Sequence, residues 1–371
     1  MELVCKKENL IRGLQIVETA ISTRTTLPVL SNFLMETEDK KIKLISTNLE
    51  IGVQCYIEGK IISSGSVTIP AKRFINIIKE LPDGENIQIK IDEKTQIDIK
   101  CGKSHFLLMG MPKEDYPILP EFKEEKAVSI DTETIKGMIK KTIFAVSTDE
   151  TRYALTGIYF IIEDGKITFV STNGRMLAYI WRGGINEKTS RHAIIPAKTI
   201  NELIHILSLE DGSNPDMKLQ IAENQMSFKV KDITLISRLI DETFPNYEQV
   251  IPRNNEIKVT INKKNLLSAT KQVFLLTQDK GGAVKFSFNK NLLRLSASVQ
   301  GLGSGEVDLD LDFAGPEFEI AFNAGYVVEI LKNMSEENVV FEMNGALDST
   351  LIRAAGDTDG NYLCVISPMR I

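Results

Sequence analysis

The sequence has few of the residues that carry most enzymatic chemistry. Of its 371 residues only three are histidine and four are cysteine. The cysteines form no C-x-x-C pair and lie far apart, at Cys5, Cys55, Cys101 and Cys364. A zinc site needs closely grouped thiolates or imidazoles, so we expect no metal, no cofactor and four reduced, buried thiols. The G-x-S-x-G, HExxH and phosphate-loop motifs are absent as well, and no catalytic residue is predicted.

Long apolar runs are also missing. Those present are far too short to span a membrane, and the opening MELVCKKENLIRG lacks the apolar stretch of a signal peptide. We therefore expect a cytoplasmic protein. The formal net charge is −6, which argues weakly against a protein that simply coats nucleic acid. Basic residues would have to be gathered on one surface for DNA to be a partner.

What the sequence does contain is a threefold internal repeat. KIKLISTN and KITFVSTN place Val170 125 residues after Ile45, and a fainter copy, LLRLSASV, places Leu295 another 125 residues on. VTIPAKRF, AIIPAKTI and FEIAFNAG recur at a spacing of 126 residues. Repeats of this length predict three domains of common size. With charged, proline-containing linkers at 119–127 and 250–258, we expect domains at 1–121, 127–252 and 256–371.

Each repeat has the same expected order of elements. It opens with a helix of about three turns, with apolar residues at helical spacing, over 8–21, 133–146 and 264–276. Alternating strands follow, such as 41–45 and 86–91, and then a second helix introduced by Pro70 or Pro196. Further strands close the repeat. The expected fold is α+β, with two helices against an antiparallel sheet in each of three repeated domains.

Basic residues gather on these expected helices although the chain is acidic as a whole. The helix after Ile261 has no acidic residue before Leu276. Lysines on one helix usually do no more than solvate its face, but here the surplus recurs in equivalent helices. It predicts phosphate contacts without base readout. The residues concerned are Lys72, Arg73, Lys136, Lys140, Lys141, Lys198, Lys263, Lys264 and Lys271.

Together these features resemble the bacterial DNA polymerase III beta subunits, the beta sliding clamp family. The resemblance covers the whole chain and rests on the repeat, the IPAK helices, STNG before Arg175, the FPNY turn and the C-terminal SPMRI. It implies a non-catalytic processivity factor, a head-to-tail homodimer that closes into a ring around double-stranded DNA. The implied partners are the replicative DNA polymerase, an ATP-driven clamp loader and other proteins with a clamp-binding motif.

The resemblance also implies three sets of site residues. For DNA it adds Arg24, Arg152 and Tyr153 to the basic residues above. For the dimer it places Phe106 and Leu108 of one subunit against Leu275 and Leu276 of the other. The implied pocket for partner peptides comprises Leu155, Thr172, Gly174, Arg175, Leu177, Pro245, Val250, Asn323, Tyr326, Ile366, Pro368, Met369 and Arg370. Gln249, Gly281 and Ser367 depart from the family's usual residues, which puts the peptide preference in doubt.

Two other interpretations stay open at this point. One is a DNA-modifying enzyme with a basic cleft, against which stands the lack of clustered catalytic residues in a repeat-symmetric chain. The other is a repeat-built protein scaffold that never meets DNA. Retention on circular but not linear DNA would separate them from a clamp.

Overall fold

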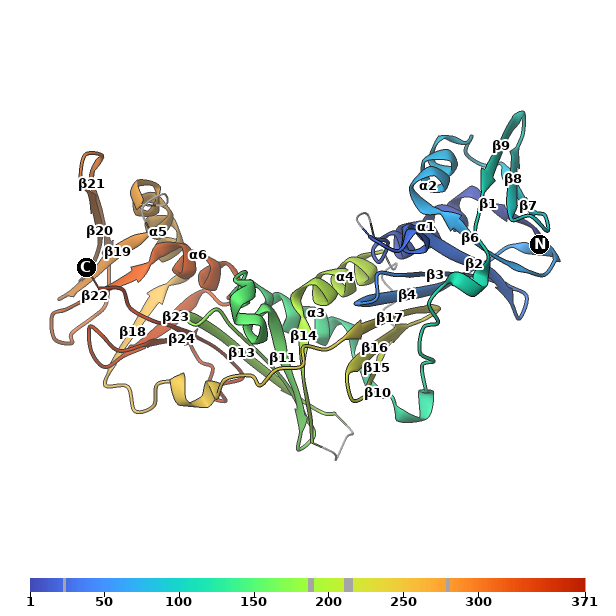
Figure 1. Cartoon of the computed structure of the whole chain (residues 1–371). Helices are drawn as coiled ribbons and strands as arrows, with labels where there is room; N and C mark the ends of the chain where they lie inside the picture. The colour runs from blue at the N-terminus through green and yellow to red at the C-terminus, as the bar shows by residue number, and fades with distance from the viewer. Residues whose placement is uncertain (23–24, 186–189, 210–215, 278–280, 371) are drawn as a thin grey trace. The chain divides into compact units, whose positions relative to one another are not determined.

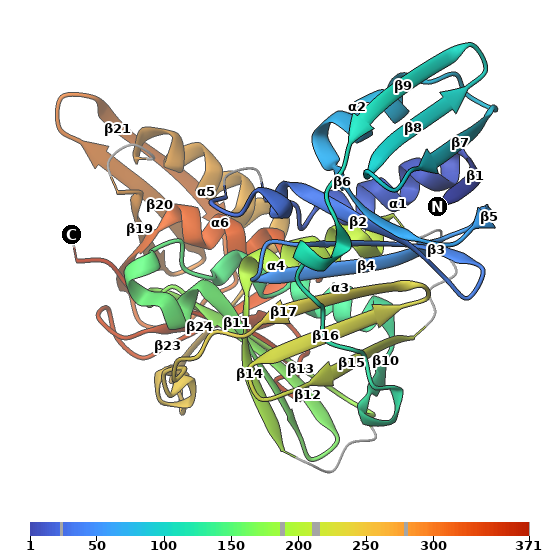
Figure 2. The ribbon, with the colours of Figure 1, turned by 45° about the vertical axis from the view of Figure 1, so that its right-hand side comes forward.

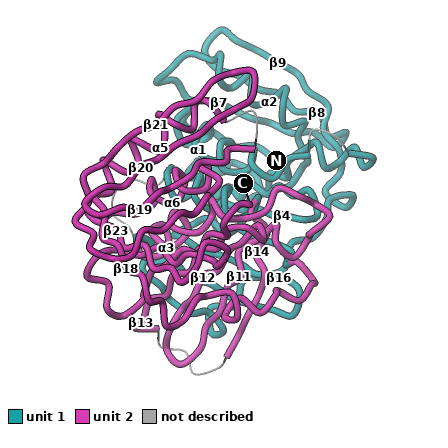
Figure 3. The backbone as a smooth tube through the Cα atoms, turned by 90° about the vertical axis from the view of Figure 1, so that its left-hand side faces the viewer, with its two compact units in different colours: residues 1–133, 198–239 teal, residues 134–197, 240–371 magenta. Residues whose placement is uncertain are grey.

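A computed structural model describes residues 1–22, 25–185, 190–209, 216–277 and 281–370 (Figures 1 and 2). The chain divides into two compact units (Figure 3). Unit 1 comprises Met1–Glu133 with Lys198–Leu239, and unit 2 comprises Thr134–Ala197 with Ile240–Ile371. The middle of the chain therefore contributes to both units.

Unit 1 contains two antiparallel sheets. The N-terminal sheet has the order β5 (Lys60–Ser63), β1 (Glu2–Lys6), β7 (Asn86–Ile91), β8 (Gln96–Cys101) and β9 (Ser104–Met109). In Figure 2 β9 lies at the outer edge of this sheet, beside β8. The first long sheet has the order β10 (Val128–Ile130), β15 (Met217–Ile221), β16 (Gln225–Val230), β17 (Ile233–Arg238), β4 (Ile51–Ile57), β3 (Lys41–Thr47), β2 (Asn32–Glu38) and β6 (Ser66–Pro70).

Unit 2 repeats this plan. The second long sheet has the order β14 (Arg191–Pro196), β11 (Gly157–Glu163), β12 (Lys166–Thr172), β13 (Met176–Gly183), β25 (Tyr362–Ile366), β24 (Thr350–Ala354), β23 (Asn338–Met343) and β18 (Ile257–Asn262). The C-terminal sheet has the order β21 (Gly303–Asp310), β20 (Leu292–Val299), β19 (Ala283–Asn289) and β22 (Phe318–Asn323). All pairings in the four sheets are antiparallel.

Amphipathic helices cover these sheets. They are α1 (Lys7–Glu18), α2 (Ala71–Glu80), α3 (Thr132–Lys140), α4 (Ala197–Ser208), α5 (Lys263–Thr277) and α6 (Ala324–Lys332). In α1 the residues Leu10, Leu14 and Val17 are buried, as the helical spacing predicts. Pro70 ends β6 and is the residue just before α2, where its missing N–H leaves no helical hydrogen bond unmade. Along the described helices no segment is long and apolar enough to cross a membrane.

Each long sheet joins the strands of two successive repeats. In the first, β17 pairs with β4, and in the second, β13 pairs with β25. We call these two pairings the joints. Because of them, the compact units do not coincide with the domains predicted at 1–121, 127–252 and 256–371. The N-terminal and C-terminal sheets belong to one repeat each, and they end at β9 and β21.

The α+β repeat fold is confirmed, with two corrections of detail. The first concerns the start of each repeat: a strand, β1, β10 or β18, precedes the helix that was expected to come first. The second concerns the third repeat. Lys285 pairs with Ser296 where Leu34 pairs with Ile45 and Tyr159 with Val170. Ser296 therefore occupies the position that spacing alone assigned to Leu295, because the third repeat is one residue longer up to this strand.

The structure describes all four cysteines, and each of them is free and buried. Burial raises the pKa of the Cys5, Cys55 and Cys364 thiols to about 12, so they stay protonated at neutral pH. Within the described ranges no three His, Cys, Asp or Glu side chains are grouped so that they could hold a metal ion.

Candidate functional site

Unit 2 contains a small cleft with a largely apolar lining and a cavity volume of about 170 Å³. It lies between the turn from β12 to β13, the segment 244–250 and the C-terminal end of β25. Its lining residues are Leu155, Thr172, Gly174, Arg175, Met176, Leu177, Phe244, Pro245, Asn246, Tyr247, Val250, Ser349, Val365 and Ser367. We call it the STNG cleft, after the turn at 171–174.

The turn owes its shape to the side chains of that motif. The Thr172 hydroxyl donates to the Met176 carbonyl at 2.7 Å and accepts from the Gly174 N–H at 3.0 Å. The Asn173 side-chain oxygen accepts from the N–H groups of Arg175 and Met176 at 2.9 and 3.0 Å. Gly174 has a φ of +84°, a conformation that costs glycine little. The turn therefore presents Arg175 as an exposed side chain at the rim of the cleft.

The floor of the cleft is part of a buried apolar cluster. Leu155, Leu177 and Val365 belong to it, each less than 9% exposed. Phe244 stacks on Tyr159 with ring centroids 4.7 Å apart, which fixes the segment that carries Pro245. Val250 at the rim is 50% exposed. An apolar floor with a few polar groups at the rim is typical of sites that bind small molecules or short peptides.

Seven of the thirteen predicted pocket residues line this cleft: Leu155, Thr172, Gly174, Arg175, Leu177, Pro245 and Val250. The other six lie outside its lining. Ile366 is buried in β25, Asn323 caps α6 by accepting from the Tyr326 N–H at 3.3 Å, and Pro368 follows Ser367 in the chain. The N–H of Met369 donates to the Ala321 carbonyl at 2.8 Å. Met369 and Arg370 line a larger cavity of about 1270 Å³ over the C-terminal sheet.

Several residues of the STNG cleft were not predicted. They are Met176, Phe244, Asn246, Tyr247, Ser349, Val365 and Ser367. Phe244, Asn246 and Tyr247 flank Pro245 in the FPNY turn, so the motif itself was the available signal. Ser349, the residue before β24, and Val365 of β25 have no such signal. Ser367 also lines the cleft.

Unit 1 contains the same turn but not the same surface. Thr47 donates to the Ile51 carbonyl at 2.9 Å, and Asn48 accepts from the Ile51 N–H at 2.8 Å, as Thr172 and Asn173 do in unit 2. At the position of Leu177, however, unit 1 has Gly52. A Cβ on Gly52 would lie 2.5 Å from Leu119 Cδ2. The linker residue Leu119 thus fills this place, and the two copies of the turn differ in what they offer a ligand.

The predicted DNA-facing residues of unit 1 lie on helices α2 and α4. Lys72 and Arg73 are exposed on the first turn of α2. Lys198 is exposed near the start of α4, 3.8 Å from the Glu50 carboxylate. An exposed pair at this distance is weak, so Lys198 can still contact a phosphate. Arg24 lies outside the described residues.

In unit 2 the basic residues lie on or beside α3 and α5. Lys140, Lys264 and Lys271 are exposed, while the Lys263 ammonium donates to the Met334 carbonyl at 2.8 Å. Lys136 is partly buried. The Lys141 ammonium lies 4.7 Å from the centre of the Tyr362 ring. Helix α5 has no acidic residue along its 15 residues, which makes it the most strongly cationic of the described helices.

Arg152 and Tyr153 lie in a short 3-10 segment, Glu150–Thr156, before β11. Both are exposed, Tyr153 by 54%. Asp149 stands beside them and accepts from the Thr151 hydroxyl at 2.7 Å, which holds the pKa of its carboxyl below the usual value. Asp149 is therefore charged at neutral pH, and its charge would repel an anionic ligand at this loop.

Comparison with known proteins identifies the family. Three models of the DNA polymerase III beta subunit match successive parts of the chain: the N-terminal domain at 1–120, the central domain at 129–246 and the C-terminal domain at 248–370. The beta sliding clamp of Chlamydia muridarum is 31% identical over 373 residues, which cover 100% of this chain and 99% of that protein. The beta sliding clamp of Staphylococcus epidermidis is 31% identical over 380 residues, with the same coverage.

Solved structures agree. The DNA polymerase III subunit beta of Pseudomonas aeruginosa superimposes with a TM-score of 0.94 at 27% identity, covering 100% of both chains. The DNA polymerase sliding clamp of Bacillus subtilis gives 0.94 at 27% identity, covering 100% of this chain and 99% of the other. A further Pseudomonas aeruginosa clamp structure, with a TM-score of 0.93 at 27% identity and full coverage of both chains, is described as bound to griselimycin. The chain belongs to the beta sliding clamp family, and its function is that of a DNA sliding clamp.

Proposed function

We propose that two copies of this chain close head to tail into a ring around duplex DNA, and that the ring tethers the replicative DNA polymerase. The observation that carries this proposal is the pair of joints inside the chain. At each of them the end strand of one half-sheet pairs with the end strand of the next repeat. Among the residues that the structure describes, β9 and β21 are the two corresponding end strands without such a partner.

An exposed edge strand invites pairing with another chain. Each copy offers β9 at one end and β21 at the other, so association is head to tail, and two copies close the circle. The facing side chains support this pairing. Phe106 and Leu108 lie opposite the buried Ile99 and Ile97 of β8 and so point to the helix side of the N-terminal sheet.

The helix side of β21 offers a matching apolar surface. A Cβ on Gly305 of β21 would lie 2.8 Å from Leu276 Cδ1 at the end of α5. The neighbouring Leu275 is 71% exposed. Pairing β9 with β21 of another copy brings Phe106 and Leu108 to these leucines, which gives the exposed Leu275 a partner.

We propose that exposed basic residues of the helices contact DNA phosphates without reading bases. A ring held by such contacts slides along the duplex, and it leaves sideways only by opening. A tethered polymerase then acts at high effective concentration. The chain carries out no chemistry itself. Opening of the ring is assigned to an ATP-driven clamp loader, and the place of action is the cytoplasm.

The DNA proposal predicts a salt-dependent weakening when lysines are removed. Replacing Lys140, Lys264 and Lys271 with alanine should weaken binding equally on unrelated DNA sequences. The slope of log K against log salt should fall by about 0.9 for each DNA phosphate that the variant no longer neutralises. Fluorescence anisotropy over a salt series measures both quantities.

The matched control removes the same charge from strands. Lys60, Lys90 and Lys285 lie on β5, β7 and β19, and replacing these three with alanine should leave the slope unchanged. Equal weakening in both variants would place DNA elsewhere. A strong sequence preference of the unaltered protein would contradict phosphate contact as the main interaction.

Partner peptides, including those of the polymerase and of other proteins with a clamp-binding motif, are assigned to the STNG cleft. Its apolar floor and the exposed Arg175 at its rim suit a short peptide with apolar side chains and an acidic or polar end. We assign griselimycin, which relatives bind, to the same cleft. This assignment rests on the seven cleft residues that coincide with the predicted pocket.

The experiment that tests the ring compares circular with linear DNA. The protein is loaded on nicked circular DNA with a clamp loader and ATP, and the complex is isolated by size exclusion at a salt concentration that removes purely ionic binding. We expect retention on the circle and release when a restriction enzyme linearises it. Equal release before and after cutting would contradict topological binding and favour the enzyme or scaffold interpretations.

A further inference from the structure

Unit 1 repeats part of the floor of the STNG cleft as well as its turn. The Leu30 carbonyl accepts from the Ser22 N–H at 3.2 Å, just as the Leu155 carbonyl accepts from the Ser147 N–H at 2.8 Å. Leu30 is therefore the counterpart of Leu155, which lines the STNG cleft. Both leucines are buried in the apolar clusters of their units.

The strand pairings give the next part of the floor. Ile236 of β17 pairs with Gly52 of β4, as Val365 of β25 pairs with Leu177 of β13. Directly paired residues point to the same face of a sheet, so Ile236 is the counterpart of Val365. Both are buried. Unit 1 thus has this part of the floor too, except that glycine stands where unit 2 has Leu177.

The linker after each repeat also has a counterpart. Tyr116 and Phe244 each stand just before a proline and belong to the buried clusters of their units. Three residues further on, Leu119 packs against the cluster of unit 1 and Tyr247 against that of unit 2. Tyr247 lines an open cleft in unit 2. In unit 1, by contrast, the Leu119 side chain lies directly on the floor, in the space that a side chain at residue 52 would need.

We propose that unit 1 contains a second peptide cleft, which the linker of the same chain keeps closed. This closed cleft comprises Leu30, Gly52, Tyr116, Leu119 and Ile236. Its ligand, once Leu119 is moved away, is a short peptide with apolar side chains. Leu119 thereby limits each chain to one peptide site. The inference rests on the proposed assignment of partner peptides to the STNG cleft.

The rim of the closed cleft supports an apolar ligand of different charge. Leu49 follows Asn48 in the turn and has a φ of +72°, a conformation that is unfavourable for leucine. Its side chain is nevertheless exposed, as is that of Ile118 beside Leu119, and exposed apolar side chains that lie together mark contact surfaces. Glu50 stands where unit 2 has Arg175. A peptide for this cleft therefore has a basic end in place of an acidic one.

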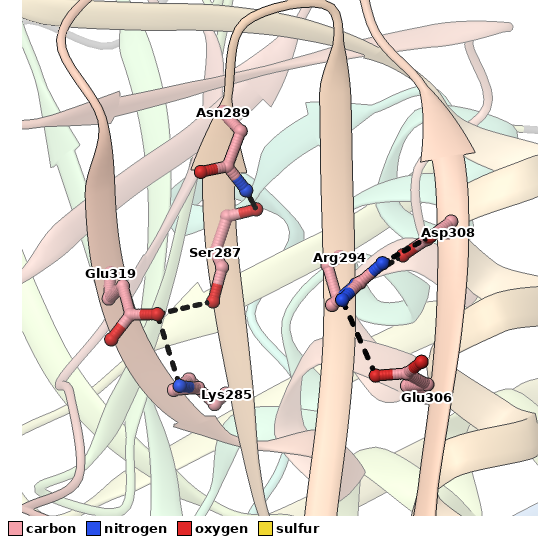
Figure 4. Close-up of polar contacts among 7 residues, drawn as sticks. All are labelled: Lys285, Ser287, Asn289, Arg294, Glu306, Asp308 and Glu319. Atoms are coloured by element: carbon pink, nitrogen blue, oxygen red, sulfur yellow. Dashed lines mark hydrogen bonds and ion pairs between the residues drawn. The ribbon is translucent and has the colours of Figure 1, made fainter.

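The large cavity over the C-terminal sheet is of another kind. Its lining includes Lys285, Glu306 and Glu319. The Glu319 carboxylate accepts from the Lys285 ammonium at 3.0 Å and from the Ser287 hydroxyl at 2.8 Å, and Glu306 lies 3.6 Å from Arg294 (Figure 4). These charges are paired with one another on the sheet. An apolar peptide therefore gains less there than on the buried apolar floor of the closed cleft.

A thiol placed on the floor tests the closure without any peptide. Ile236→Cys puts a thiol beneath Leu119, and the four native thiols are buried. Adding Leu119→Ala should speed the reaction of this thiol with a maleimide on the order of tenfold or more, because thiol reactivity follows exposure. Ile118→Ala, which alters the exposed neighbour, is the matched control and should leave the rate unchanged. Equal rates in the two proteins would overturn the closure.

Peptide binding tests the site itself. The exchange variant, Gly52→Leu with Leu119→Ala, moves the leucine from the linker to the floor, as in unit 2. Val250→Asp is added to block the STNG cleft. The probes are a labelled polymerase-derived peptide and a version of it with lysine in place of its acidic residues. Val250→Asp alone should bind neither probe, whereas the combined variant should bind one peptide per chain and favour the lysine version.

The outcomes separate this inference from the proposed function. A folded combined variant that binds neither probe would overturn the second cleft and leave the STNG cleft standing. Undiminished binding by Val250→Asp alone, or no binding by the unaltered chain, would instead overturn the assignment of peptides to the STNG cleft, and the inference with it. If thermal unfolding shows that the exchange variant does not fold, Leu119→Ala replaces it in the same titration with the same expected result.

Discussion

A chain in which Leu275 and Leu276 are both replaced by alanine is expected to be monomeric at concentrations where the unaltered chain is dimeric. Leu275 is 71% exposed in the single chain, so its removal leaves the fold of unit 2 largely unaffected. In the ring proposed above, both leucines would be buried against Phe106 and Leu108 of the other copy. A buried leucine truncated to alanine costs about 2 kcal/mol or more. Two leucines at each of two joints therefore amount to roughly 8 kcal/mol, about a millionfold in Kd.

Analytical ultracentrifugation at sub-micromolar concentration measures this change. The matched control is Ile118→Ala with Leu347→Ala, since both side chains are exposed, by 96% and 68%, and neither lies on β9, β21 or α5. The control should stay dimeric, and thermal unfolding of both variants should show an intact fold. A leucine variant that remains fully dimeric would remove these residues from the joint.

The repeat could be found in the sequence because the residues that recur most regularly form local hydrogen bonds. In both copies of the STN turn, threonine and asparagine close hydrogen bonds to residues at most four positions away. The same turn in both units uses the same residue types, threonine followed by asparagine. The IPAK segments likewise end a strand and start a helix within a few residues. Local chemistry of this kind is readable from sequence.

The joints could not be read in the same way. β17 pairs with β4 across about 180 residues of sequence, and β13 pairs with β25 across a similar distance. No local sequence pattern predicts which of these strands pair. The strands β1, β10 and β18 were also missed, since short segments such as Val128–Ile130 carry too few residues for alternation to be recognised. The register of the third repeat was predicted wrongly for a related reason. One inserted residue shifts the weakly matching segment by one position without changing its sequence pattern.

The candidate site was foreseen in part. Family resemblance, and not periodicity, supplied the pocket residues, and seven of them line one cleft. Met369 and Arg370 lie apart from the cleft because the C-terminal tail passes on to the C-terminal sheet, where the Met369 N–H donates to the Ala321 carbonyl. The predicted pocket residues of unit 2 are therefore divided between the STNG cleft and the larger cavity that contains Met369 and Arg370. The basic helix residues were found from sequence because charge surplus on a helix needs no tertiary information.

Replacing Val250 with aspartate is expected to abolish stimulation of the polymerase while leaving the dimer intact. Val250 is 50% exposed in a short 3-10 turn, so the folded chain tolerates a charged side chain there. A docked apolar peptide would bury that carboxylate without a partner, which costs several kcal/mol. We expect peptide affinity to fall at least a hundredfold, about 2.7 kcal/mol.

Two assays measure this effect: primer extension on loaded circular DNA, and anisotropy of a labelled polymerase-derived peptide. Leu347→Asp is the matched control, because Leu347 is exposed in the same unit but lines the larger cavity instead of the cleft. Deleting residues 368–371 leaves the cleft lining intact, since that lining ends at Ser367. If Val250→Asp bound normally while Leu347→Asp and the deletion did not, partners would dock in the larger cavity beside Met369 and Arg370. Abolished binding in Val250→Asp with full activity in Leu347→Asp would place them in the STNG cleft.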